Sequence, residues 1–82
     1  MAAPGFAVRA VEVEAGGERA YEEAEWEDAI VVVARGEIEL ECLGGTCSRF
    51  ERGSVLWLVG LPLKALRCRG TEPALLVAVS RR

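Results

Sequence analysis

The chain has 82 residues, of which 51% are hydrophobic, and its 13 acidic and 10 basic side chains give a formal net charge of −3. This hydrophobic content excludes a disordered chain, the lack of an apolar run of about 18–20 residues argues against a membrane-spanning helix, and the negative charge disfavours nucleic-acid binding. The first residues lack the basic start and apolar centre of a signal peptide, so we expect one soluble, cytoplasmic domain over residues 1–82, without nucleic-acid or membrane partners.

Two features narrow the chemistry. The sequence has no histidine, which removes the commonest metal ligand and the commonest general base. Its cysteines, Cys42, Cys47 and Cys68, form no Cys-x-x-Cys pair, and we interpret them as reduced thiols that pack as small apolar side chains. A Cys42–Cys47 link across the Gly44-Gly45 turn is geometrically conceivable.

Charge is divided unevenly along the chain. Residues 1–41 carry 11 acids and three bases, a net −8, whereas residues 42–82 carry two acids and seven bases, a net +5. Either the two halves face each other and their charges intersperse, or an acidic patch meets a basic patch on another subunit. A chain of this size buries only about 60–65% of its unfolded surface, so a homodimer would be a natural supplement to its core.

The first half of the chain is expected to form strands. Phe6–Glu14 is β-prone and ends at the turn Gly16-Gly17. Residues 18–28 have helix propensity, but a strand around Arg19–Glu22 followed by an acidic loop fits better between two strands of a sheet. An apolar strand over Ala29–Ala34 follows.

Strict alternation of acidic and apolar residues over Glu37–Cys42 is typical of a half-buried antiparallel strand. Its buried side would hold Ile38, Leu40 and Cys42, and its solvated side Glu37, Glu39 and Glu41. Further strands are expected over Thr46–Phe50 (in hairpin register with residues 37–42), Ser54–Val59 (largely buried), Leu63–Arg69 and Ala74–Val79, with a flexible segment 1–4 and a basic tail 81–82. Seven to nine short antiparallel strands indicate an all-β sandwich or barrel.

Two glycine-centred runs carry a family resemblance. Gly36 lies within Val-Val-Ala-Arg-Gly-Glu-Ile-Glu-Leu, and Gly53 opens a run that continues through Val59-Gly60-Leu61 to Lys64 and Cys68. These runs resemble the first and second motifs of the cupin family, and the resemblance covers about residues 5–80. It implies a cupin-type double-stranded β-helix, or jelly-roll barrel.

The resemblance also aligns the positions of the cupin metal ligands. Counting back from Gly36 places Ala29 at the ligand glutamate. The ligand histidines correspond to Glu23 and Glu25, or with the longer motif spacing to Glu22 and Ala24, and the last of them to Lys64. Alanine has no donor atom and a protonated lysine has no lone pair, so the resemblance implies a metal-free cupin without a cofactor.

Within the cupins, the run from Pro4 to Val8, the Gly-Gly-Glu-Arg segment and the strand pair around Gly36 look like the C-terminal, metal-free cupin domain of type I mannose-6-phosphate isomerases. In those enzymes the zinc and most catalytic residues lie in a preceding domain. The resemblance therefore implies a stand-alone or excised accessory domain.

The same resemblance places Lys64 inside the barrel, where it would hold an anionic ligand or act as a base, unless it reaches the barrel mouth and pairs with Glu23 or Glu25. Trp57, in an apolar strand, is expected in the core. Trp26, in an acidic and irregular stretch, could line the barrel mouth, cap a hydrophobic patch or anchor a dimer contact. Cys68 is expected to pack against the core. The candidate ligand-binding residues at the barrel mouth are Glu23, Glu25, Trp26, Trp57, Lys64 and Cys68, with no catalytic or metal-binding residue assigned.

Three functions follow from these residues. The first is a non-catalytic, metal-free cupin, dimeric, that binds a small anionic ligand or serves in assembly. The alternative is an enzyme of the sugar-phosphate isomerase type, or its accessory domain, in which Lys64 and a nearby glutamate act as acid and base. The third is an interaction partner within a larger complex that uses the uneven charge.

Overall fold

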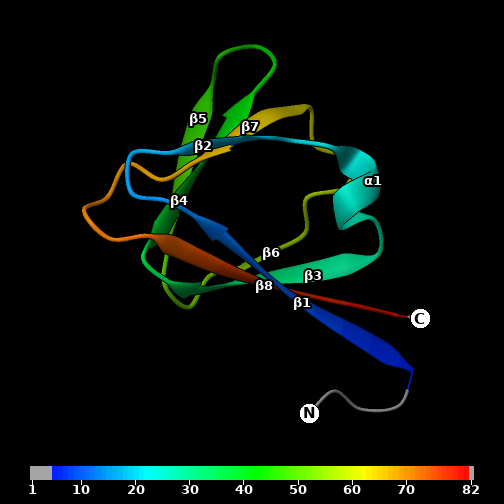
Figure 1. Ribbon diagram of the computed structural model, residues 1–82. Helices are drawn as coiled ribbons and strands as arrows, with labels where there is room; N and C mark the ends of the chain where they lie inside the picture. The colour runs from blue at the N-terminus through cyan, green and yellow to red at the C-terminus, as the bar shows by residue number, and fades with distance from the viewer. Residues whose placement is uncertain (1–4, 82) are drawn as a thin grey trace.

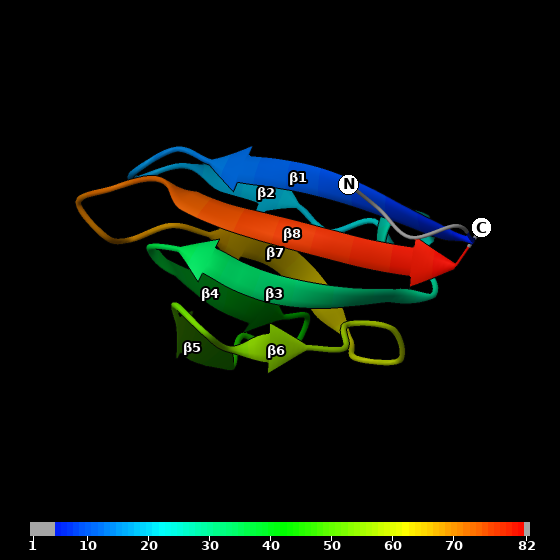
Figure 2. The same cartoon turned by 90° about the horizontal axis from the view of Figure 1, so that it is seen from below.

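The computed structural model describes residues 5–81, which form two four-stranded antiparallel sheets and one short helix (Figure 1). Sheet A contains, in order across the sheet, β1 (Phe6–Val13), β8 (Ala74–Arg81), β3 (Ala29–Arg35) and β6 (Val55–Leu56). Sheet B contains, in order, β2 (Glu18–Ala20), β7 (Leu63–Arg67), β4 (Glu37–Cys42) and β5 (Cys47–Glu51). The helix α1 (Glu23–Trp26) follows β2, and Figure 2 shows the four strands of sheet A side by side.

The all-β prediction is confirmed, and the eight strands in residues 5–81 fall within the expected seven to nine. The β4–β5 hairpin has the expected register, with Glu41 opposite Cys47. Residues 1–4 and Arg82, which we expected to be a flexible segment and part of a basic tail, lie outside the described residues. Arg81 is not in a tail, because it is the last residue of β8 and pairs with Phe6 of β1.

Two segments differ from the sequence-based prediction. The acidic loop expected after β2 contains the single helical turn α1. The strand expected over Ser54–Val59 is reduced to Val55–Leu56, because Ser54 and Gly53 bond to Val33 of β3 within a turn and the chain leaves the sheet after Leu56. Within residues 5–81 the structure contains no helix with the length and apolar character that a membrane crossing requires.

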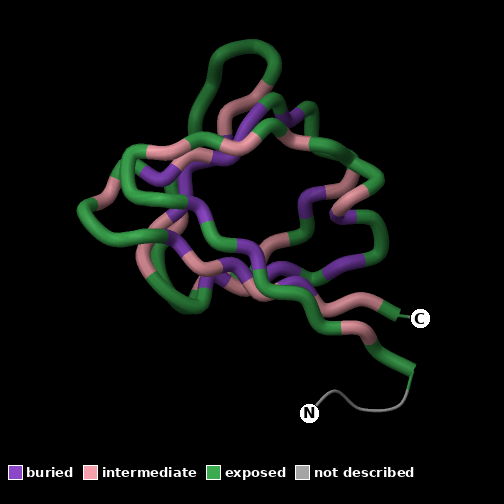
Figure 3. The backbone as a smooth tube through the Cα atoms, viewed as in Figure 1, coloured by how far each residue is buried: buried purple, intermediate pink, exposed green. Residues whose placement is uncertain are grey.

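The hydrophobic core lies between the two sheets (Figure 3), and buried positions alternate with less buried ones along most of β3 and β8 and at the end of β1. Sheet A contributes Val31, Val33 and Leu76, and sheet B contributes Ile38 and Leu66, each at most 1% exposed. Full burial of one such aliphatic side chain stabilises a fold by about 1.5–3 kcal/mol. The alternation in β4 is therefore confirmed on its apolar side.

The chain passes from sheet A to sheet B at Gly36, between β3 and β4. Its φ of 69° lies in the left-handed region, which costs a side-chain-bearing residue about 1–2 kcal/mol. A Cβ atom at this position would also lie 2.6 Å from the backbone carbonyl oxygen of Pro73. Since that oxygen belongs to the main chain and cannot rotate away, only glycine fits this corner.

Arginines from the second half of the sequence cover the acidic residues on the outward face of sheet B. Arg67 Nη2 lies 2.7 Å from Glu41 Oε1, as an ion pair without the alignment of a hydrogen bond, and Arg67 Nε lies 3.3 Å from Glu18 Oε1. Arg69 Nε donates a hydrogen bond of 2.8 Å to Glu39 Oε1. Glu39 is only 9% exposed, so the expected solvated ladder is wrong at this residue. In these pairs the charges of the two halves intersperse.

Candidate functional site

Helix α1 lies beside one end of the barrel and turns Trp26 into the core (Figure 1). The side chain of Trp26 is 0% exposed and belongs to the same buried cluster as Leu58 and Leu66. The guanidinium carbon of Arg9 lies 5.1 Å from the centre of its ring, a cation–π distance. The prediction that Trp26 lines the barrel mouth is wrong, because Trp26, the last residue of α1, is buried in the core with Arg9 of β1 over its ring.

Two arginines converge on Glu25 of α1. Arg9 Nη1 lies 3.2 Å from Glu25 Oε2 and Arg9 Nη2 donates a 2.6 Å hydrogen bond to the backbone oxygen of Glu25. Arg19 of β2 donates from both Nε and Nη2 to the same carboxylate. The hydrogen bond from Arg19, with smaller contributions from its charge and from Arg9, holds the pKa of Glu25 below its usual range despite partial burial. Glu25 therefore joins an edge strand of each sheet, β1 and β2.

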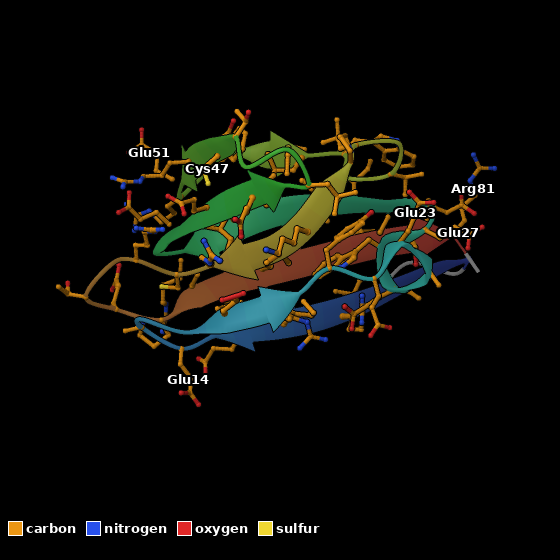
Figure 4. The ribbon with its side chains drawn as sticks, turned by 90° about the horizontal axis from the view of Figure 1, so that it is seen from above. Glu14, Glu23, Glu27, Cys47, Glu51 and Arg81 are labelled. Carbon is orange, nitrogen blue, oxygen red and sulfur yellow. The ribbon has the colours of Figure 1, made fainter. Side chains whose placement is uncertain are left out.

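Glu23 and Tyr21 tie the α1 region to the loop that follows β6. Gly60 N donates a long 3.4 Å hydrogen bond to Glu23 Oε1, and the Tyr21 hydroxyl donates a bond of the same length to the backbone oxygen of Leu58. Burial, and to a lesser extent the charge of Glu23, raises the pKa of Tyr21. Seen from the side of sheet B, Glu23, Glu27 and Arg81 lie at one end of the molecule (Figure 4). These contacts connect the α1 region to the loop after β6.

Lys64 and Trp57 do not lie where the sequence placed them. Lys64 is exposed, because the pairing of β4 with β7 shifts register between Glu41 and Cys42, opposite this part of β7. The residues on either side of it, Leu63 and Ala65, are both buried. The prediction of an inward lysine is therefore wrong. Trp57 is 53% exposed, and the prediction that it lies in the core is wrong, because β6 ends before it and Leu58 takes the core position at 1% exposure.

Cys68 is buried, and its Sγ lies 3.1 Å from the backbone oxygen of Glu72. This position agrees with the expected packing role. Cys42, Cys47 and Cys68 are all free. Of the six candidate residues, Glu23, Glu25 and Trp26 share helix α1, whereas Lys64 and Trp57 lie exposed and outside this group.

The residues at the cupin metal-ligand positions do not fit a metal ion. Glu25 is held by Arg9 and Arg19, Ala29 has no donor, and Lys64 is exposed. Across residues 5–81 no group of three or more His, Cys, Asp or Glu side chains is placed to hold one. Metal-assisted chemistry therefore has no ligand set at these positions.

A surface hollow of about 550 Å³ lies on the outer side of sheet A, and sequence reasoning missed it. Its apolar walls are Phe6, Ile30, Trp57 and Val79, and its polar residues are Asp28, Ser80 and Arg81. One signal could have found it. Strands β3 and β8 are apolar on both sides, which is typical of strands with both faces covered.

Of three comparisons with known proteins, the one with solved structures found matches. No protein-family model matches the sequence, and no curated protein matches it. Among solved structures, the chain is similar to a Cupin 2 conserved barrel domain protein from Salinispora arenicola, with 21% identity and a TM-score of 0.73 over 100% of this chain and 71% of that one. It is similar to the Cupin_2 domain of an XRE family transcriptional regulator from Enterobacter cloacae, with 19% identity and a TM-score of 0.70 over 95% and 82%.

A third similar structure is a sugar phosphate isomerase of the cupin superfamily from Silicibacter pomeroyi, with 26% identity and a TM-score of 0.66 over 95% of this chain and 51% of that one. The narrower likeness to the mannose-6-phosphate isomerase domain stays a prediction. The two antiparallel sheets, the glycine corner at position 36 and the similar structures all indicate the same fold. The chain has the fold of the cupin superfamily.

Proposed function

We propose that the chain is a non-catalytic cupin module with a filled barrel, and that it works through its outer surface, in the assembly of protein subunits. The observation that carries the proposal is Trp26, whose fully buried ring occupies the end of the barrel beside α1. A cupin that binds or transforms a small molecule in its barrel needs open space there. An indole ring in the core leaves little.

The two carboxylates of α1 support the same interpretation, since both already have partners. The carboxylate of Glu25 is bound by Arg9 and Arg19, and Glu23 accepts a bond from Gly60 N. A ligand entering from this end would have to displace two arginines from one carboxylate. Hydrogen bonds between charged groups are among the stronger ones in proteins, so the cost would fall on the ligand.

The likeness to a sugar phosphate isomerase, at 26% identity, favours an enzyme as the second candidate. In this chain such an enzyme would use Lys64 and a nearby glutamate. Lys64 is exposed, and it takes part in none of the ion pairs found in the described part of the chain. The packed interior therefore supports the first candidate more strongly.

Tryptophan fluorescence tests the proposal. In the Trp57→Phe variant, Trp26 is the only tryptophan left and reports on the barrel interior. We expect its emission to be that of a buried indole and to be unchanged by fructose 6-phosphate, inorganic phosphate or Mn²⁺ at concentrations up to about 10 mM, which exceed ordinary dissociation constants. A saturable shift with any of these probes would overturn the proposal.

The matched control is Trp26→Phe, which leaves exposed Trp57 as the reporter and separates surface binding from binding in the barrel. Turnover tests the second candidate directly. If the purified chain isomerises a sugar phosphate, and Lys64→Met abolishes turnover without changing the unfolding transition, the enzyme reading replaces the proposal.

A further inference from the structure

The outward face of sheet A has an uninterrupted apolar centre. Antiparallel pairing sets Val8, Val79 and Ile30 in one row across three strands. The next row on the same face is Ala10, Val77, Val32 and Val55. Val8, Ile30 and Val55 are 54%, 49% and 65% exposed. Single exposed apolar side chains need no explanation, but two complete adjacent rows mark an interaction surface.

The charged residues of this face lie beyond the two rows, toward the two ends of the strands, and they balance at each end. Asp28 and Arg81 lie together at one end, where both line the hollow beside Trp57. At the other end Glu12 and Arg35 both pair with Leu75. Each end therefore carries one acid and one base. Neither end of this face carries an excess of one sign of charge, so a second copy can be oriented on it without like-charge repulsion.

We propose that this face binds a second copy of the chain, forming a two-fold dimer in which the apolar rows of two A sheets pack against each other. The inference rests on the proposed function in one respect, because it places the working surface outside the barrel. A two-fold interface uses the same patch on both subunits, so the patch must be self-complementary. The balanced ends and the central apolar rows meet that requirement.

Charge and shape favour a second copy over a lipid surface. Binding to an anionic membrane needs an excess of basic residues around the apolar patch, and here each basic residue has an acidic neighbour. The hollow of about 550 Å³ at one end also suits the side chains of a protein partner better than a flat bilayer surface. The chain as a whole carries a charge of −3, which further disfavours anionic lipid.

The size of the face predicts a weak dimer. Strands β1 and β8 have eight residues each, β3 has seven and β6 has two. With a rise of about 3.3 Å per residue and strands about 4.8 Å apart, the face covers roughly 400 Å² in projection. Two copies would bury somewhat more than about 800 Å² in total, which is at the low end of the range for weak, transient interfaces. We therefore expect a dissociation constant on the order of 10 µM.

Sedimentation equilibrium between about 1 and 200 µM tests the inference, since this range spans the expected constant. Ile30→Lys and Val8→Lys each place an ammonium group in the central row, and we expect each to weaken the dimer by at least about 30-fold. Leu43→Lys is the matched control, because Leu43 is 70% exposed but lies in the β4–β5 hairpin, outside sheet A. We expect it to change the constant by less than about two-fold.

The circular dichroism spectrum and urea midpoint of each variant check that it folds, and Val8→Lys in edge strand β1 carries the test if Ile30→Lys does not. A wild-type chain that is monomeric at the highest concentration would overturn the inference. So would Ile30→Lys and Val8→Lys dimers as tight as the wild type, or sedimentation of a monomeric chain with phosphatidylcholine vesicles. Monomers together with unresponsive Trp26 fluorescence would overturn this inference and leave the filled barrel standing. A Trp26 fluorescence signal that responds to ligand in a chain that still dimerises would overturn the filled barrel and leave this inference standing.

Discussion

The outward faces of the two sheets differ in kind. Sheet B presents acids and arginines that pair with each other, among them Glu39 with Arg69 and Glu41 with Arg67. Sheet A presents rows of valine, isoleucine and alanine, with charges only at the ends. The inward faces of both sheets pack onto the same core. The difference shows that the barrel itself needs only one face of each sheet, and that the second face of sheet A is apolar for another reason.

The strongest test of what the two sheets share is Trp26→Ala. Truncating a large aromatic side chain in a core costs about 3–5 kcal/mol, and Trp26 is fully buried between α1 and both sheets. Urea unfolding of the monomer at low concentration measures the loss. Trp57→Ala, at 53% exposure, is the control and should cost less than about 1 kcal/mol. Equal losses would mean that the barrel end is not packed as described.

The link between the sheets at their β1 and β2 edges should depend on pH. Glu25 has a lowered pKa in the folded chain, relative to the ordinary value of 4.5, because Arg19 and Arg9 stabilise its charged form. This stabilisation is therefore fully present above pH 4.5 and disappears as the pH falls through the lower, folded pKa. Glu25→Gln should be less stable than the wild type at pH 7, and the difference should close in acid.

Urea midpoints at neutral pH and at several values below pH 4.5 measure this closing difference. Glu14→Gln is the control, because Glu14 is exposed and forms no ion pair within the described residues. A difference in urea midpoint between the wild type and Glu25→Gln that persists into strong acid would show that the carboxylate acts through its shape and not through its charge.

The two outward faces should respond differently to salt, and this is the smallest of the expected effects on stability. Glu39→Gln removes the charge that Arg69 meets at 2.8 Å, and we expect a loss of no more than about 1 kcal/mol at low salt, shrinking toward zero near 0.5 M NaCl. Glu37→Gln, on the same strand without an ion pair in the described structure, is the control. Dimer affinity should stay constant or rise slightly over the same range. A dimer that salt dissociates would place its interface on sheet B.

The sequence predicted the parts of the fold that depend on local pattern. Glu37–Cys42 alternates within one strand, and the structure places Ile38 and Leu40 in the core accordingly. The family resemblance carried by the runs around Gly36 and Gly53 predicted the jelly-roll barrel, and the structure has Gly36 at the corner between β3 and β4. Both signals lie within a few residues of the feature they specify.

The errors concern positions that depend on distant partners. Lys64 is exposed and not inside the barrel, because a register shift opposite Leu63 interrupts the alternation of β7. Trp57 and Trp26 exchanged their expected roles, because β6 ends at Leu56 and one turn of helix, covered by Arg9 from another strand, buries Trp26. No pattern within either segment contains that information. The apolar faces of β3 and β8 were visible in the sequence, but an apolar strand does not say whether its second face meets a helix, a sheet or another chain.

The corner at Gly36 has a consequence for how this chain can diverge. The obstacle to a side chain there is the main-chain oxygen of residue 73, so replacing Pro73 would not remove it. Substitutions elsewhere in the core can be compensated by a neighbour of different volume, but none can compensate this one without moving the loop that leads into β8. Core valines can therefore be replaced while the fold is kept, but residue 36 must remain glycine wherever the chain crosses between the sheets in this way.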